Sequence, residues 1–305
     1  MRVIRKADSA GARVIALGTF DGVHRGHCRL IRTARALARE TGIPLRICTF
    51  DRHPLEVLRP ENPPELLSTM PEKASQMCRL GADEMELIPF GRETADMEPE
   101  AFLANLRNRM NVRAVVVGWN YSFGRKGRGN AELLKADGEA FGYRVVIVPP
   151  VSLEDGTAIS SSLIRQKLKE GKITEAAELL GRRYTISGTV AQGKHQGRQL
   201  GFPTANIEPW KRKALPKYGV YTSLLETESG MLPAVANIGL QPTIPSGKVT
   251  VEAHILNESQ ALYGQKVRLT PLTLLREEKR FANSAELAAQ IEKDRREALR
   301  LFDMA

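Results

Sequence analysis

The chain of 305 residues is long enough for two domains, and its 42% hydrophobic and 26% charged residues are typical of a globular protein rather than a disordered or fibrous one. No apolar stretch approaches the roughly 18 residues of a membrane span, and the three cysteines form no CxxC pair; we therefore expect a cytoplasmic protein with no membrane partner, no disulfide framework and no zinc site. The net charge of +10 is divided between both halves in short clusters, which favours small polyphosphate ligands over nucleic acid.

The first half alternates between predicted strands and helices. An apolar run at 14–18 leads into a polar loop and then into a helical pattern that stops at Gly42. The alternation continues with strands at 45–50, 85–90, 113–119 and 143–148 and helices at 72–80, 99–110 and 131–141. Two short helices, one opening at 160–162 and one capped by Thr174, end this half. The pattern predicts an α/β fold with a Rossmann-like, doubly wound parallel sheet covered by helices.

The second half changes to short β-rich segments. They lie at 184–191, 219–225, 232–238, 249–256 and 266–274, with turn residues and no helix between them. This spacing predicts a small antiparallel β-barrel or sandwich. Asn283 and Glu286 predict a capping box for an amphipathic C-terminal helix that covers one barrel face. We therefore place the two domains at 1–182 and 183–305.

A histidine-containing loop, GTFDGVHRGH at 18–27, lies between the first predicted strand and helix. Backbone N–H groups at a helix start point outward, and the helix dipole there favours negative charge. Gly22 and Gly26 let the backbone approach a phosphate, while His24 and His27 can aim two imidazole donors at one place. The loop lacks the lysine of a P-loop and the glycine pattern of a dinucleotide site. It predicts a phosphate site, with surface or capping histidines as the alternative.

Two more polar loops are predicted at the same edge of the sheet. The segment ISSSLIR at 159–165 puts hydroxyls at another helix start and an arginine one turn later. The segment 119–128 follows the fourth strand as a glycine-rich basic loop. Their convergence suits nucleotidyl transfer, in which a phosphate attacks the α-phosphorus of ATP and pyrophosphate leaves. The protein then needs mainly to orient the groups and stabilise charge.

The β-rich half contains a second candidate phosphate loop at 193–206. Its glycines with Lys194 or Arg198 suit phosphate, and Thr204 with Asn206 offers hard oxygen ligands for Mg²⁺. The loop has no aromatic repeat on which RNA bases would stack. An ordinary turn is the alternative interpretation.

Glu252 is the candidate base of this half. In the alternating segment 250–256, Glu252 and His254 share one face of a predicted strand. A carboxylate projecting from a barrel strand can orient a substrate hydroxyl and accept its proton as the γ-phosphoryl group transfers. A solvated strand glutamate is the alternative.

Several motifs in order carry a family resemblance. In the first half they are GTFDGVHRGH, FDRHP, VGWNYSFG and ISSSLIR, and in the second half PTAN, KYGVY, ANIG and VEAHIL. The first four resemble the nucleotidyltransferases that bear an H-x-G-H motif. Together, the motifs resemble the bacterial bifunctional riboflavin kinase and FAD synthetase family over nearly the whole chain. The resemblance implies phosphorylation of riboflavin to FMN in the second domain and adenylylation of FMN to FAD in the first, both with ATP and Mg²⁺.

The resemblance also implies roles for individual residues. In the first domain, the ATP phosphates would be held by His24 and His27, the nucleotide pocket shaped by Gly18, Phe20 and Asp21, and the two substrates secured by Asn120, Ser161, Ser162 and Arg165. His53 is as well explained as a turn residue as it is as a ligand. In the second domain, Gly193 and Gly201 would keep the loop close to the phosphates, Thr204 and Asn206 would hold ATP and Mg²⁺, and Glu252 would act on the ribityl 5′-hydroxyl.

Two other functions stay open on the sequence. One is another nucleotidyltransferase acting on a small phosphorylated substrate, which the PTAN-bearing second half disfavours. The other is a flavin- or nucleotide-binding regulator without catalysis, which Glu252 and the two loop histidines disfavour. The chain also departs from the family's usual pattern at Ile244-Pro245 and Asn257-Glu258, departures that could change flavin affinity or loop closure.

Overall fold

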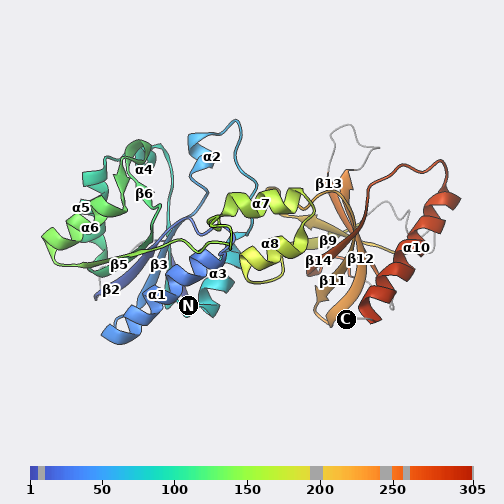
Figure 1. Cartoon of the computed structure of the whole chain (residues 1–305), viewed down its shortest axis with the longest axis horizontal. Helices are drawn as coiled ribbons and strands as arrows, with labels where there is room; N and C mark the ends of the chain where they lie inside the picture. Colours follow the sequence, from blue (N-terminus) through green and yellow to red (C-terminus); the bar gives the residue numbers. More distant parts are fainter. Residues whose placement is uncertain (6–10, 193–201, 241–248, 257–261, 304–305) are drawn as a thin grey trace. The chain divides into compact units, whose positions relative to one another are not determined.

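The computed structural model describes residues 1–5, 11–192, 202–240, 249–256 and 262–303. The chain forms two compact units, Met1–Ser161 and Ser162–Ala305, whose elements are labelled in Figure 1. A domain boundary after residue 182 stays a prediction.

The first unit is built on a parallel sheet, as predicted. Its strand order is β1-β4-β3-β2-β5-β8, and every neighbouring pair is parallel. The strands are β1 (Arg2–Ile4), β2 (Arg13–Leu17), β3 (Leu45–Phe50), β4 (Glu84–Ile88), β5 (Val112–Gly118) and β8 (Arg144–Val148). A short antiparallel pair, β6 (Ser122–Phe123) and β7 (Gly129–Asn130), follows β5 and encloses a 3₁₀ turn at Arg125–Gly127.

Helices cover both faces of this sheet. They are α1 (Arg25–Thr41), α2 (Leu55–Leu58), α3 (Met70–Arg79), α4 (Arg92–Ala95), α5 (Pro99–Met110) and α6 (Ala131–Phe141). In β2, Val14 and Ala16 join the core formed with α1, whereas Ile15 and Leu17 join the core formed with α5 and α6. Strand β2 is therefore apolar on both faces, as expected for a central strand of a doubly covered parallel sheet.

The second unit contains a closed antiparallel barrel, which settles the choice between barrel and sandwich. Its order is β10-β13-β12-β11-β14-β9. The strands are β9 (Ile186–Ala191), β10 (Ala205–Pro209), β11 (Gly219–Thr227), β12 (Gly230–Leu240), β13 (Val249–Ile255) and β14 (Lys266–Glu277), and the helices are α7 (Ser161–Lys169), α8 (Ile173–Leu180) and α10 (Ser284–Asp303). The sequence patterns did not predict β10.

Two predicted helix caps differ from the structure in detail. Helix α8 begins at Ile173 with Lys172 as its N-cap, so Thr174 lies inside the helix rather than capping it. Gly171 has a φ of 77° and ends the preceding turn, and the chain re-enters a helix at once. At α10, the Asn283 side chain accepts from the Glu286 amide at 2.9 Å, but the Glu286 carboxylate accepts from Ala282. The Glu286 carboxylate therefore accepts from the amide one residue before the predicted donor, which was that of Asn283.

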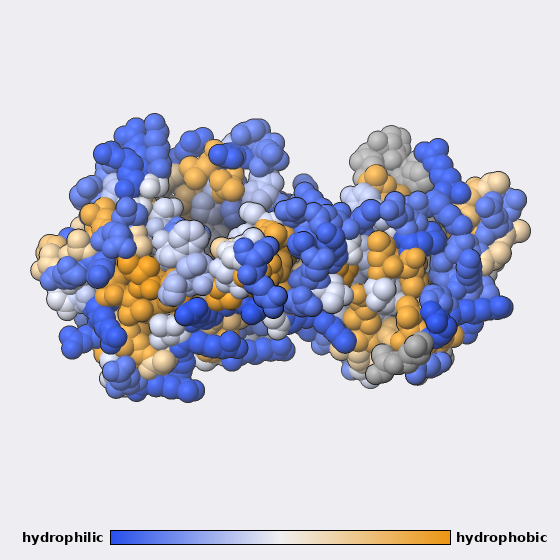
Figure 2. All heavy atoms as spheres, in the orientation of Figure 1, coloured by the Kyte–Doolittle hydropathy of each residue, from blue (hydrophilic) through white to orange (hydrophobic). Residues whose placement is uncertain are grey.

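No helix in the described part of the chain is both long and apolar enough to cross a lipid bilayer. The face of the molecule shown in Figure 2 is mostly hydrophilic over both units and carries separate apolar patches.

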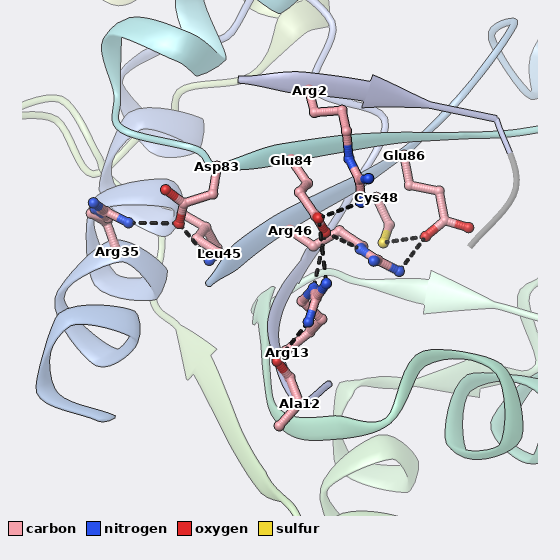
Figure 3. Close-up of polar contacts among 10 residues, drawn as sticks. All are labelled: Arg2, Ala12, Arg13, Arg35, Leu45, Arg46, Cys48, Asp83, Glu84 and Glu86. Atoms are coloured by element: carbon pink, nitrogen blue, oxygen red, sulfur yellow. Dashed lines mark hydrogen bonds and ion pairs between the residues drawn. The ribbon is translucent and has the colours of Figure 1, made fainter. Parts of the chain in front are cut away.

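A buried ion-pair cluster lies where β2, β3 and β4 begin. The guanidinium of Arg46 is fully buried and donates to Glu84 at 2.8 Å and to Glu86 at 3.4 Å. Arg13 and Arg2 also donate to Glu84, at 2.9 and 2.8 Å, and Figure 3 shows the three arginines directed at this one carboxylate. The cluster lies at the amino-terminal edge of the sheet, so it supports the fold from the edge opposite the loops described next.

Candidate active sites

The histidine loop at 18–27 follows β2 at the point where the strand order of the sheet reverses. The chain passes from β2 to β3 on one side and later returns to β5 on the other. Loops leaving adjacent strands in opposite directions open a crevice at the carboxyl ends of the strands, where α/β proteins bind ligands. The loop after β5, residues 119–128, lies at the same edge. The topology therefore puts both predicted loops at one switch point.

The histidine loop has a strained backbone. Phe20 and Val23 have φ angles of 51° and 41°, a region that costs non-glycine residues roughly 1–3 kcal/mol each. Phe20 is fully buried, and a Cβ placed on Gly18 would lie only 3.0 Å from its ring. Gly18 is thus needed because the Phe20 ring lies against it. Strain of this kind persists only where surrounding contacts hold it in place.

Asp21 anchors the loop through both its side chain and its backbone. Its buried carboxylate accepts from the backbone N–H groups of Leu67, at 3.0 Å, and Ser68, at 3.2 Å. The Ser161 hydroxyl donates to the Asp21 carbonyl at 2.9 Å, and the Gly22 amide donates to the Ser68 hydroxyl at 3.0 Å. Asp21 and Ser161 are therefore brought together. Ser68 was missed, because only the fold brings it to the loop.

The two loop histidines lie side by side at the start of α1. Their ring centroids are 3.7 Å apart with an interplanar angle of 22°, and the Phe20 ring meets His27 edge-on at 5.2 Å. His24 is the N-cap of α1, and its Nδ1 accepts from the His27 amide at 3.4 Å. An accepting Nδ1 assigns the neutral ring's proton to Nε2. A Cβ on Gly26 would lie 3.1 Å from the His24 ring, so glycine leaves room for it.

The remaining residues discussed for the first site are Asn120, Ser162, Arg165 and His53. Asn120 is exposed just past the end of β5, at the carboxyl edge of the sheet. Ser162 and Arg165 lie on α7 in the second unit, so their part in the site stays a prediction. The Nδ1 of His53 accepts from the Leu55 amide at 3.2 Å, which is a turn contact just before α2, and a role of His53 as a ligand stays untested.

In the second unit, the barrel register puts three polar residues in one row. Asn206 of β10 pairs with Glu252 of β13, and Glu252 pairs with Asn237 of β12. Directly opposite residues on antiparallel strands share a face, with Cβ atoms about 4.5–5.5 Å apart. Val251 and Ala253 are fully buried on the other face. Asn206 and Glu252 therefore meet as predicted. Asn237 gained no role from sequence, because only the register reveals its place.

His254 secures the segment that carries Thr204. Its Nδ1 lies 2.9 Å from the Pro203 carbonyl and thus donates to it, and its ring meets Phe202 edge-on at 5.5 Å. Thr204 directly precedes β10. The predicted loop residues Gly193 and Gly201, like Lys194, Arg198, Ile244-Pro245 and Asn257-Glu258, lie outside the described residues.

The described residues contain no group of three or more His, Cys, Asp or Glu side chains that could hold a metal ion. The candidate oxygen donors at the second site are instead one hydroxyl, one amide oxygen and one carboxylate, from Thr204, Asn206 and Glu252. Hard oxygen ligands of this kind fit Mg²⁺, which is usually held by one or two carboxylates together with substrate phosphates.

The fold and the two groups of residues define a two-domain enzyme of phosphoryl and nucleotidyl transfer. A family model described as FAD synthetase matches residues 6–163, and one described as riboflavin kinase matches residues 180–302. The chain belongs to the bifunctional riboflavin kinase/FMN adenylyltransferase family and acts in FAD biosynthesis with ATP as a substrate. This confirms the function predicted from the motifs over the two alternatives.

Relatives match over almost the whole chain. The bifunctional enzyme of Bacillus subtilis is 34% identical, with 95% of this chain and 92% of the relative covered. That of Escherichia coli K12 is 33% identical, with 95% and 93% covered. A crystal structure described as a macrolide-efflux protein from Streptococcus pneumoniae is 31% identical with a TM-score of 0.86, and 96% of each chain is covered.

Proposed function

We propose that the histidine loop is the adenylyl-transfer site. An oxygen of the FMN phosphate attacks the α-phosphorus of ATP, the bond to the β-phosphate bridging oxygen breaks, and pyrophosphate leaves. His24 and His27 donate hydrogen bonds to the ATP phosphates at the N-terminus of α1, where the helix dipole also favours negative charge. Asp21 and Phe20 hold the loop in shape. Asn120, Ser161, Ser162 and Arg165 secure the substrates.

We further propose that Glu252 is the base of the riboflavin kinase site. It accepts the proton of the ribityl 5′-hydroxyl as that oxygen attacks the γ-phosphorus of ATP and ADP leaves. Asn206 and Thr204 hold the ATP phosphates and Mg²⁺, which screens the negative charge of the triphosphate when bound. Gly193 and Gly201 keep the loop close to the phosphates. The row Asn206–Glu252–Asn237 is the observation that carries this assignment.

The substrates are small molecules, and we propose that the reactions take place in the cytoplasm, where ATP and Mg²⁺ are abundant. Mg²⁺ dependence is tested by chelation. Excess EDTA is expected to stop both FMN and FAD formation, and added Mg²⁺ to restore them. Persistent FMN formation in EDTA would contradict the proposed role of Thr204 and Asn206.

Two variants test the site assignment. Glu252→Gln is expected to lower FMN formation from riboflavin at least about 100-fold, a typical general-base contribution, while FAD formation from supplied FMN continues. His27→Ala is expected to do the reverse. Products are separated by chromatography, and the untouched activity of each variant reports that the chain is folded.

Glu226→Gln is the matched control for Glu252→Gln. Glu226 also lies on a barrel strand, but it pairs with Arg268 at 2.7 Å, so its loss should leave both activities unchanged. If both activities fell together in folded Glu252→Gln or His27→Ala, the two sites would be wrongly assigned.

A further inference from the structure

A buried lysine lies against the histidine loop, and the activity described above does not yet use it. Lys73, on α3, is only 7% exposed, and its Nζ donates to the Thr19 carbonyl at 2.8 Å. Lysines are almost never fully buried unless paired. Here the contact partner is a backbone oxygen of the loop that presents His24 and His27.

The charge of Lys73 is kept in an unfavourable environment. Burial lowers its pKa to about 8, although the carboxylates of Asp21 and Glu56 oppose this shift. The ammonium form therefore predominates at neutral pH. A cation that is desolvated at a cost to stability, in a site of strained backbone, points to a functional role more than to a stabilising one.

The start of α3 fixes where Lys73 lies. Thr69 and Glu72 form a capping box, with the Thr69 hydroxyl accepting from the Glu72 amide at 3.3 Å and the Glu72 carboxylate accepting from the Thr69 amide at 2.9 Å. Ser68, directly before this box, binds Asp21 and Gly22. The segment 67–73 thus contacts the loop at successive points, and Lys73 contributes a charged donor to these contacts.

The Thr19 carbonyl has a second, uncharged donor. The hydroxyl of Thr49, at the end of β3, donates to it at 3.0 Å. Both donors act on the residue directly before Phe20, whose φ is 51° and whose ring contacts His27. A shift of the Thr19 carbonyl would therefore relax Phe20 and move the His27 ring.

We propose that Lys73 is a positioning residue of the adenylyltransferase: its ammonium holds the Thr19 carbonyl, and with it the strained loop that presents His24 and His27 to the ATP phosphates. The proposal rests on the proposed role of these histidines. It assigns Lys73 an effect on the rate of transfer through loop geometry, without contact to the substrates.

The test compares two substitutions in the full-length chain. Lys73→Met keeps the length and apolar stem of the side chain but removes the charge and the donor, whereas Lys73→Arg keeps both. We expect Lys73→Met to lower kcat for FAD formation from FMN about 100-fold, as misplacement near 1 Å can do, with a much smaller change in KM. Lys73→Arg should stay well above Lys73→Met.

The thermal stability of Lys73→Met should not fall with its kcat for FAD formation. Because Lys73→Met removes a desolvated cation, its thermal unfolding midpoint should equal or exceed that of the parent. FMN formation from riboflavin should be unchanged in both variants. Lys135→Met is the matched control, because Lys135 is exposed on α6 and should leave both activities at parental level.

Thr49→Val completes a double-mutant cycle on the same carbonyl. Alone, Thr49→Val should lower kcat for FAD formation less than Lys73→Met does. In the double variant, the fold-loss of kcat should differ clearly from the product of the two single fold-losses, because both side chains act on one oxygen. Independent, multiplying effects would contradict action through Thr19.

Three results would overturn the proposal. One is a Lys73→Met protein that is as active as Lys73→Arg. Another is a loss of FAD formation in Lys73→Met that is fully explained by unfolding of the first unit. The same comparison of activity and unfolding is made with Lys73→Gln, which keeps an uncharged N–H donor. The third is full activity in Lys73→Met while His27→Ala is inactive, which separates failure of this inference from failure of the site assignment.

Discussion

Glu84 is the residue on which the buried ion pairs of the first unit converge. Burial alone would raise the pKa of its carboxyl, but hydrogen bonds from Arg13 and Arg46, with their charges, outweigh burial and lower it to about 2. A carboxyl whose pKa is lowered by folding stabilises the fold above its unfolded pKa. That contribution is lost as pH falls through the folded pKa. The relevant window here lies between the ordinary value of 4.5 and about 2.

The first residue-scale prediction concerns acid stability. Unfolding of the first unit should become easier between pH 4.5 and pH 2, since protonating Glu84 loses up to about 3.5 kcal/mol at roughly 1.4 kcal/mol per pKa unit. Glu84→Gln should be destabilised already at pH 7 and should show a flatter decline below pH 4.5. Thermal unfolding followed across this pH range measures both. A parallel decline in parent and variant would show that other carboxyls control acid unfolding.

Residues differ in how far sequence alone reveals them. His24 and His27 were found because they lie within one short motif, and their place at a helix start follows from local pattern. Lys73 and Ser68 reach the same loop from a separate segment, and Glu84 meets Arg13 and Arg46 only after three strands align. Such contacts depend on tertiary packing, which single-sequence periodicity does not encode.

At the scale of elements, β10 shows why one strand of the second site escaped prediction. It is only five residues long, contains Asn206 and ends at Pro209, so its pattern reads as a turn. Pairing with β9 on one side and β13 on the other makes it a strand. By contrast, the alternation of β13 predicted that Glu252 and His254 share a face, and the register agrees.

His254 provides the element-scale prediction, because its contact with the Pro203 carbonyl ties the segment before β10 to β13. His254→Leu should raise the KM for ATP in riboflavin phosphorylation and lower kcat/KM about tenfold, as expected for losing a hydrogen bond worth about 1.4 kcal/mol. FAD formation from FMN should not change. His254→Asn, which can still donate, should be less impaired.

Thr250→Val is the control for this prediction, since Thr250 lies on the same strand and face, and its hydroxyl is 3.5 Å from the Gly239 carbonyl. Equal kinase losses in His254→Leu and Thr250→Val would mean that any change on this face impairs the site, and that the Pro203 contact has no particular role.

At the scale of the whole molecule, the two proposed sites belong to different folds in one chain. The point of division matters for α7 and α8. Both helices belong to the same compact unit as the barrel. The Leu168 carbonyl of α7 accepts from the Lys217 amide at 2.8 Å, and α8 packs against β14. Sequence alternation places both helices with the first domain, and this boundary after residue 182 stays a prediction, since periodicity identifies a helix without identifying what it packs against.

Two fragments distinguish these boundaries. Residues 162–305 retain α7 and α8, whereas residues 183–305 lack them and would leave barrel surface beside β14 uncovered. Since each large apolar side chain that loses its packing costs about 1.5–3 kcal/mol and 1 kcal/mol shifts the midpoint of a small domain by about 4–8 °C, the shorter fragment should unfold at least about 10 °C lower. Both retain Thr204, Asn206 and Glu252, so both should form FMN from riboflavin at temperatures where they are folded. Equal midpoints would instead favour a boundary after residue 182, with α7 and α8 dispensable to the barrel.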